Sequence, residues 1–96
     1  MRNLYIVSYD ISDPTRLRQV HRKMKAYGDK LQYSVFLCEI NDKEKNRMIS
    51  TLTTIIKHND DQVLIIPLGP PDGYNIQNIQ SIGQPFARDD SGAAVY

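Results

Sequence analysis

The sequence predicts an α+β fold in which two helices pack against one face of a small sheet. Short runs rich in β-branched and aromatic residues alternate with two segments whose apolar residues recur at helical spacing. The expected order is strand, helix, strand, a possible further strand, helix, strand and a last strand. Helices on one face of a mixed or antiparallel sheet give a ferredoxin-like βαββαβ sandwich, here with an extra C-terminal strand.

The first half of the chain supplies a strand and a helix. Residues 4–9 contain no glycine or proline and are rich in β-formers, so we expect a strand there. Ser12 or Asp13 can cap a helix that has Pro14 at its first position and ends at Gly28. The helix buries one face, formed by Leu17, Val20, Met24 and Tyr27.

The second half predicts a long strand, a helix and two more strands. Segment 31–40 has apolar residues on both sides, with Gln32, Ser34, Phe36 and Cys38 on one side and Leu31, Tyr33, Val35 and Leu37 on the other. A helix begins at Asn41 or Asp42 and buries Met48, Leu52, Ile55 and Ile56. Strand 62–68 contains Pro67, which predicts a strand end or a sheet edge, and a short last strand is expected over 76–83.

The chain length and composition favour one small domain that pairs with a second copy. We expect a ferredoxin-like domain over residues 1–83 and a tail, 84–96, whose apolar end either docks as an extra strand on a partner or frays. Helices cover only one sheet face, so the apolar residues on both sides of segment 31–40 favour a homodimer. A single cysteine, Cys38, favours a reducing cytoplasm, and no apolar run or N-terminal signal indicates a membrane partner.

Basic residues gather in one segment of a nearly neutral chain. Segment 14–30 has six lysines and arginines against Asp29 alone, a net charge of +5, whereas the whole chain carries +1. Such a patch predicts a polyanion partner on one face, and a solvated helix surface is the alternative. The patch consists of Arg16, Arg18, Arg22, Lys23, Lys25 and Lys30.

Four motifs together resemble a known family. They are YDISD at 9–13, RLR at 16–18, the Gly28-Asp29 turn and LQYSVFLCEI at 31–40. In this order and spacing they resemble the CRISPR-associated Cas2 family over residues 4–83. The resemblance implies a dimeric ferredoxin-like protein of CRISPR adaptation that serves as the central dimer of the spacer integrase complex and so has the integrase as a partner. It also implies metal-dependent nuclease activity on RNA or DNA, and a C-terminal tail, 84–96, that contacts the partner protomer or the integrase.

The resemblance assigns roles to particular residues. Asp10, at the end of the first strand, matches the metal-binding acid, for Mg²⁺ or Mn²⁺. The other residues matched to the family's catalytic site are Tyr9, Arg16, Arg18, Ser34 and Phe36. Magnesium is commonly held by one or two carboxylates together with water and substrate phosphate, so a two-fold dimer would supply a second Asp10. The basic patch would then contact the backbone of double-stranded DNA or of RNA.

Simpler interpretations remain beside these assignments. Asp10 can accept hydrogen bonds from loop N–H groups, Tyr9 and Phe36 can be core residues, and His21 is expected to be a packing or surface residue. Other functions also stay open. They are a toxin-like ribonuclease of related fold, such as the virulence-associated family D, and a non-catalytic ferredoxin-like regulatory module.

Overall fold

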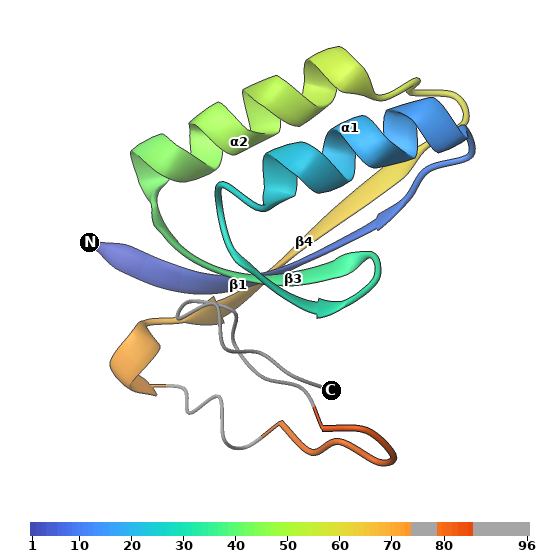
Figure 1. The fold of residues 1–96 in the computed structure, drawn as a ribbon. Coiled ribbons are helices and arrows are strands. Elements are labelled where there is room, and N and C mark those ends of the chain that lie inside the picture. Colours follow the sequence, from blue (N-terminus) through green and yellow to red (C-terminus); the bar gives the residue numbers. More distant parts are fainter. Residues whose placement is uncertain (74–78, 86–96) are drawn as a thin grey trace.

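The computed structural model of the chain describes residues 1–73 and 79–85. Within these ranges, a pair of helices lies on one face of a four-stranded sheet (Figure 1). The strands are β1 (Arg2–Asp10), β2 (Asp29–Gln32), β3 (Val35–Asn41) and β4 (Gln62–Gly69). The helices are α1 (Pro14–Met24) and α2 (Asp42–Ile55), and a short 3₁₀ turn, Pro71–Gly73, follows β4. This is the predicted βαββαβ order.

The sheet has the strand order β2-β3-β1-β4, and all neighbouring strands are antiparallel. Each helix connects two strands that are separated by one other strand, which is the split βαβ arrangement of ferredoxin-like domains. Pro67 lies on β4, an edge strand, as its missing N–H group requires. The ferredoxin-like prediction is confirmed.

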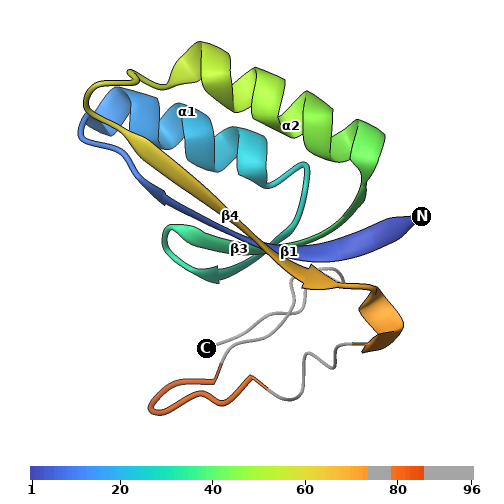
Figure 2. The ribbon, with the colours of Figure 1, turned by 180° about the vertical axis from the view of Figure 1, so that it is seen from behind.

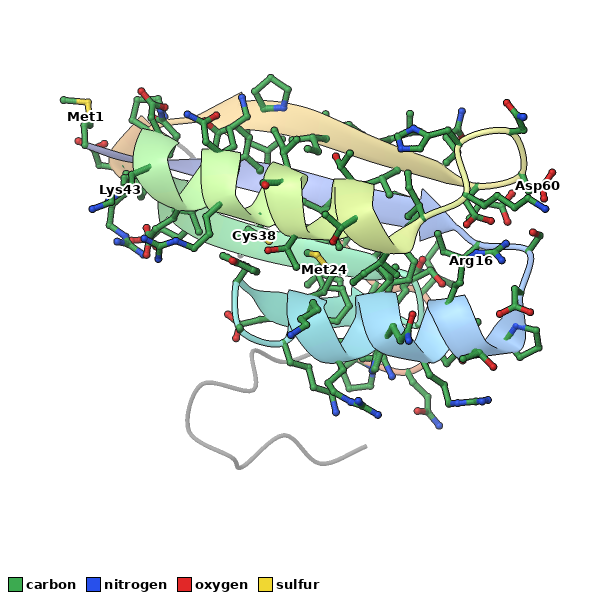
Figure 3. All side chains as sticks on the ribbon, turned by 90° about the horizontal axis from the view of Figure 1, so that it is seen from above. Met1, Arg16, Met24, Cys38, Lys43 and Asp60 are labelled. Carbon is green, nitrogen blue, oxygen red and sulfur yellow. The ribbon has the colours of Figure 1, made fainter. Side chains whose placement is uncertain are left out.

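The core lies between the helices and the sheet. Tyr5, Val7 and Tyr9 alternate along β1 and face the helices, and Phe36, Cys38 and Ile40 do so from β3. Figure 3 shows Met24 of α1 and Cys38 of β3 in the middle of this layer. Both are completely buried.

Both helices begin at side-chain caps. The Asp13 carboxylate accepts from the Arg16 N–H at 3.0 Å, and Pro14 stands in the first turn as predicted. Asn41 and Glu44 form a reciprocal capping box at the start of α2. The first helix ends at Met24, three residues before Tyr27, and a turn leads to Gly28. Over residues 1–73 and 79–85, neither helix has the length and apolar character needed to cross a bilayer.

The prediction of one strand over 31–40 is wrong, because this segment contains a hairpin turn. Gln32 pairs with Val35, so Tyr33 and Ser34 form the loop, and the register shifts between Lys30 and Gln32. In the described residues no residue other than glycine has a positive φ, so the turn needs no glycine or asparagine. The sequence therefore lacked the usual signal for a turn, and Ser34 lies in the loop instead of on a strand.

The structure also differs from the prediction at the expected C-terminal strand. Residues 79–85 are described and contain no strand, and Ile82 is fully exposed. The rest of the expected strand, 76–78, and most of the predicted tail, 86–96, lie outside the described residues.

The sheet face away from the helices is only partly covered. By strand alternation it carries Leu4 and Leu37, which are buried, and Leu64 and Ile66 on β4, which are 47% and 46% exposed. Figure 2 shows the same two-layer arrangement from behind, with both helices on one side of the sheet. This face therefore has a half-exposed apolar edge, whereas the core between the helices and the sheet is closed.

Candidate functional site

Asp10 is the last residue of β1 and is exposed to solvent. Its neighbour Tyr9 faces the helices, so Asp10 lies on the opposite face of the sheet, which also carries Leu64 and Ile66. On β4 it pairs with Gln62. The predicted metal-binding acid thus stands at the rim of the partly uncovered face.

Among the described residues, neither arginine of the RLR motif pairs with Asp10 within one protomer. Arg18 is exposed on α1, and its side chain makes a long hydrogen bond, 3.4 Å, to the Thr15 hydroxyl. Arg16 is paired with Asp61 instead of Asp10. Among the described residues, no ion pair joins Asp10 to a basic side chain.

Asp61 binds several donors at the end of the molecule where β1 meets α1. Its carboxylate accepts from Arg16 Nε at 2.8 Å and Arg16 Nη2 at 3.1 Å. The Ser12 backbone N–H and hydroxyl donate to it at 3.0 and 3.1 Å, and the Lys57 N–H donates at 2.8 Å. The Arg16 guanidinium and these donors hold the pKa of Asp61 well below its usual range.

The other predicted catalytic residues belong to an aromatic cluster beneath α1. Tyr9 and Phe36 are 4% and 1% exposed, and their ring centroids lie 6.2 Å apart. The Tyr9 hydroxyl hydrogen-bonds to His21 Nδ1 at 3.0 Å, and His21 in turn stacks on Tyr33. The Tyr9 N–H donates to the Ser34 carbonyl at 3.1 Å. Tyr9, Ser34 and Phe36 therefore come together, in the packing role that was the simpler interpretation for the two aromatics.

The environment of this cluster keeps both titrating groups neutral. Burial, reinforced by the nearby Tyr33, raises the pKa of Tyr9 to about 12, so its hydroxyl keeps its proton at physiological pH. Burial, together with Lys30 and Lys25, lowers the pKa of His21 below its ordinary value. The Tyr9–His21 hydrogen bond therefore joins a neutral phenol and a neutral imidazole.

We expect the stability of the protein to fall as the pH is lowered from 7.5 to 5. Because the pKa of His21 is lower in the folded protein, the unfolded chain binds the proton at a higher pH than the folded protein does. The contribution of neutral His21 to the unfolding free energy is therefore fully present above about pH 6.5 and is lost as the pH falls below that value. Urea unfolding at both pH values should show a smaller decline for His21→Gln than for the wild type. His58→Gln, a change at an exposed histidine, is the control and should keep the wild-type decline. Equal declines in all three proteins would contradict the assignment.

The other basic residues of the predicted patch 14–30, without Arg16, form an exposed surface, which we call the α1 basic face. Its members are exposed and lie on the outer side of α1, just after it, and on β2: Arg18, Arg22, Lys23, Lys25 and Lys30. The first turn of α1 contains no acidic residue, and none of the five has an ion pair among the described residues. Lys30 also lies over the Tyr33 ring, 5.4 Å from its centroid. Among the described residues, Arg16 is the one member of the predicted patch that forms an ion pair.

Two residues of this region had no clear signal in the sequence. Asp61 precedes a strand in an acidic stretch, and its partner Arg16 is 45 positions earlier, so no local pattern links them. Tyr33 was expected on a strand, yet it is 63% exposed at a hairpin tip. His21 was expected to pack or lie at the surface, and it packs while also binding Tyr9.

Asp10 by itself is only part of a magnesium site. Among the described residues, no three acidic, histidine or cysteine side chains gather into a metal-binding group. Magnesium often takes one or two carboxylates and completes its shell with water and substrate phosphate. An exposed carboxylate at a strand end can be one of these ligands, and water, substrate phosphate or a second carboxylate would complete the shell.

Comparisons with known proteins agree with the geometry. The family model for CRISPR-associated protein Cas2 matches residues 2–74. A Rhodospirillum rubrum protein named CRISPR-associated endoribonuclease Cas2 1 is 40% identical over 82 residues, 85% of this chain and 79% of that protein. A Geobacter sulfurreducens protein named CRISPR-associated endoribonuclease Cas2 is 38% identical over 86 residues, 90% of each chain.

Solved structures show the same architecture. The crystal structure of Streptococcus pyogenes Cas2 at pH 6.5 superposes with a TM-score of 0.72 at 28% identity, covering 83% of this chain and 99% of that one. A hypothetical protein from Thermus thermophilus gives a TM-score of 0.75 at 25% identity, covering 88% and 94%. The similarity therefore extends over nearly the whole of these neighbours.

Proposed function

Because this chain belongs to the CRISPR-associated Cas2 family, we propose that it is a dimeric nucleic-acid-binding protein of CRISPR adaptation. In this proposal its α1 basic face binds the backbone of double-stranded DNA, and the CRISPR integrase is its protein partner. A second, conditional activity is Mg²⁺- or Mn²⁺-dependent hydrolysis of phosphodiester bonds in RNA or DNA at Asp10. The name that the relatives carry, endoribonuclease, supports this second activity.

The observation that carries the binding proposal is the exposure of the α1 basic face. Four of its members, Arg18, Arg22, Lys23 and Lys25, fall within eight residues along and just after one helix, all exposed. Cations that are not neutralised by neighbouring acids release counterions from a phosphate backbone when they bind it. Because this attraction reads charge and not bases, it suits a protein that must accept DNA of any sequence.

The dimer proposal rests on the face that the helices leave uncovered. Leu64 and Ile66 remain nearly half exposed on an edge strand, and a 96-residue chain gains much by burying such a surface against a copy of itself. Asp10 stands on that same face. A two-fold axis near the end of β1 would bring two Asp10 carboxylates together and supply a second carboxylate ligand.

The residues of this chain would then divide the work of hydrolysis. Asp10 would hold the ion, and the exposed Arg18 would bind the nucleic-acid backbone elsewhere along the strand by charge-assisted hydrogen bonds. Bound Mg²⁺ would supply polarisation of a phosphate oxygen and activation of water. Tyr9 and Phe36 are buried behind Asp10, so their proposed role is to orient the strand end instead of touching the phosphate.

Reversing two charges of the α1 basic face tests the binding proposal. We expect Arg18→Glu with Arg22→Glu to weaken double-stranded DNA binding at least about tenfold, equally for unrelated sequences. The slope of log K against log salt should fall by about 1.8, because each phosphate contact contributes about 0.9. Fluorescence anisotropy at several salt concentrations measures both quantities.

A matched reversal on the other helix controls for net charge. Lys43→Glu with Arg47→Glu changes the charge equally, but these exposed residues lie on α2. Figure 3 shows Lys43 at the end of the molecule opposite to Arg16. An equal loss of DNA affinity in this control, or a loss for one DNA sequence alone, would contradict the proposal that the α1 basic face binds the DNA backbone.

A further inference from the structure

We propose that Asp61 is a positioning residue for the Asp10 end of β1, and that Arg16 serves Asp61 there instead of contacting phosphate. This inference rests on the proposed function, because it assigns a distinct task to one arginine of the predicted nucleic-acid-binding patch. Asp61 lies on the loop before β4 and is far from Asp10 in the sequence. The two arginines of RLR, two residues apart on one helix, would then have different tasks.

The Asp61 carboxylate joins three segments of the chain. It receives donors from the loop after β1, through Ser12 N–H and Oγ, from α1, through Arg16, and from the loop after α2, through Lys57 N–H. The Asp61 N–H also donates back to the Lys57 carbonyl at 2.8 Å. The side chain of Asp61 is inaccessible to solvent because its own donors cover it. Replacing it would release all of these donors together.

This arrangement fixes Asp10 from two sides. Ser12, two residues after Asp10, is bound by its backbone N–H, which restrains the chain as it leaves β1. Gln62, the residue after Asp61, is the β4 partner of Asp10. One carboxylate therefore sets both the exit of β1 and the start of the strand that pairs with it, and a metal ligand needs such a fixed backbone to keep its geometry.

The same contacts take Arg16 out of the phosphate-binding set. Its Nε and Nη2 both donate to Asp61, and Nη2 is also 3.2 Å from the Ser12 hydroxyl. The side chain is 23% exposed, and the ion pair neutralises its charge. Arg18, two residues on, is exposed and has the long hydrogen bond to Thr15. A neutralised and occupied guanidinium releases no counterions when DNA binds, whereas a free one does.

The wild-type protein allows a first test without any substitution. In protein labelled with ¹⁵N in arginine, a double-stranded DNA of about 20 base pairs, long enough to cover several phosphate contacts, is titrated while the Nε–H resonances are observed by NMR. We expect the Arg16 resonance to exchange slowly with solvent and to stay in place, and the Arg18 resonance to shift. An Arg16 resonance that shifts as far as that of Arg18 would overturn the assignment.

Variants then separate positioning from binding. Arg16→Gln combined with Asp61→Asn removes the pair without changing the net charge, so we expect the salt slope of DNA binding to stay within about 0.3 of the wild type. Arg18→Gln, the matched single change, should lower the slope by about 0.9. The rate of Mg²⁺-dependent cleavage at saturating nucleic acid, per folded molecule, should fall about tenfold or more in the double variant, because Asp10 is no longer held.

The neighbouring acid supplies a further control. Asp60→Asn removes a carboxylate that forms an exposed ion pair with Lys57 Nζ at 3.2 Å, and it should leave DNA binding and cleavage unchanged. Amide hydrogen exchange should show faster exchange at Ser12 in Asp61→Asn and not in Asp60→Asn. If the Ser12 amide stays protected in Asp61→Asn, the positioning role is wrong. If Arg18→Gln leaves the salt slope unchanged, the proposal that the α1 basic face binds DNA is wrong instead. The hydrogen-exchange experiment still decides the role of Asp61.

Discussion

Replacing Asp10 by asparagine should lower the rate of metal-dependent cleavage at least about 100-fold while leaving DNA binding within about twofold. Asparagine keeps the shape of the side chain but removes the charge that holds the ion, and a metal contributes several kcal/mol to such a reaction, at about 1.36 kcal/mol for each factor of ten. Asp10 is exposed, so the change should not disturb the core. Cleavage of a labelled RNA and a labelled DNA with Mg²⁺ or Mn²⁺ measures the effect.

The same variant separates the scaffold role from the nuclease role. We expect spacer acquisition in cells to survive Asp10→Asn, because a scaffold needs a dimer and a positive surface more than it needs a metal. Sedimentation should show that the variant still forms dimers. Loss of acquisition by a variant that still dimerises and binds DNA would show that the metal site works within the integrase complex. Undiminished cleavage would place the nuclease site elsewhere or point to a contaminating enzyme.

Gly28→Ala should cost about 3 kcal/mol of unfolding free energy, near the upper end for overpacking of a core. A Cβ added at Gly28 would lie 2.6 Å from Cys38 Sγ and 2.9 Å from the Leu37 carbonyl carbon, and closer still to the Leu37 carbonyl oxygen. Two of these atoms belong to the β3 backbone, which cannot move without disturbing the sheet. Urea unfolding should detect the loss, and the melting temperature should fall by more than about 10 °C.

Gly69→Ala is the contrasting substitution. Gly69 has φ of 95°, and no atom of the described residues lies within 4 Å of an added Cβ, so its cost should come from the backbone alone, about 1 kcal/mol. Gly28 is not among the glycines with positive φ, so its requirement is space and not conformation. A loss at Gly28 no larger than that at Gly69 would mean that the α1–β2 connection can move away from β3.

The sequence by itself determined the elements whose signals are local. Helix α1 begins where Asp13 and Pro14 predicted, and the spacing of Met48 and Leu52 identified the buried face of α2. The end of β1 at Asp10 and the edge position of Pro67 also follow from short-range chemistry. These features could be predicted because each depends on a few neighbouring residues, and the same motifs carried the family resemblance.

The tertiary structure decided the features that depend on residues far apart in the chain. The hairpin turn at Tyr33 and Ser34 is set by pairing in the sheet, and it contains no glycine, proline, asparagine or aspartate that would have indicated a turn. Arg16 was expected to belong to the basic patch beside Arg18. Only the packing of the loop before β4 against α1 pairs it with Asp61. Asp10 likewise faces away from α1 because Tyr9 is drawn into the core, and alternation along β1 then turns Asp10 to the other face. Local sequence fixes which side chains are available, but the register and packing of distant segments choose their partners.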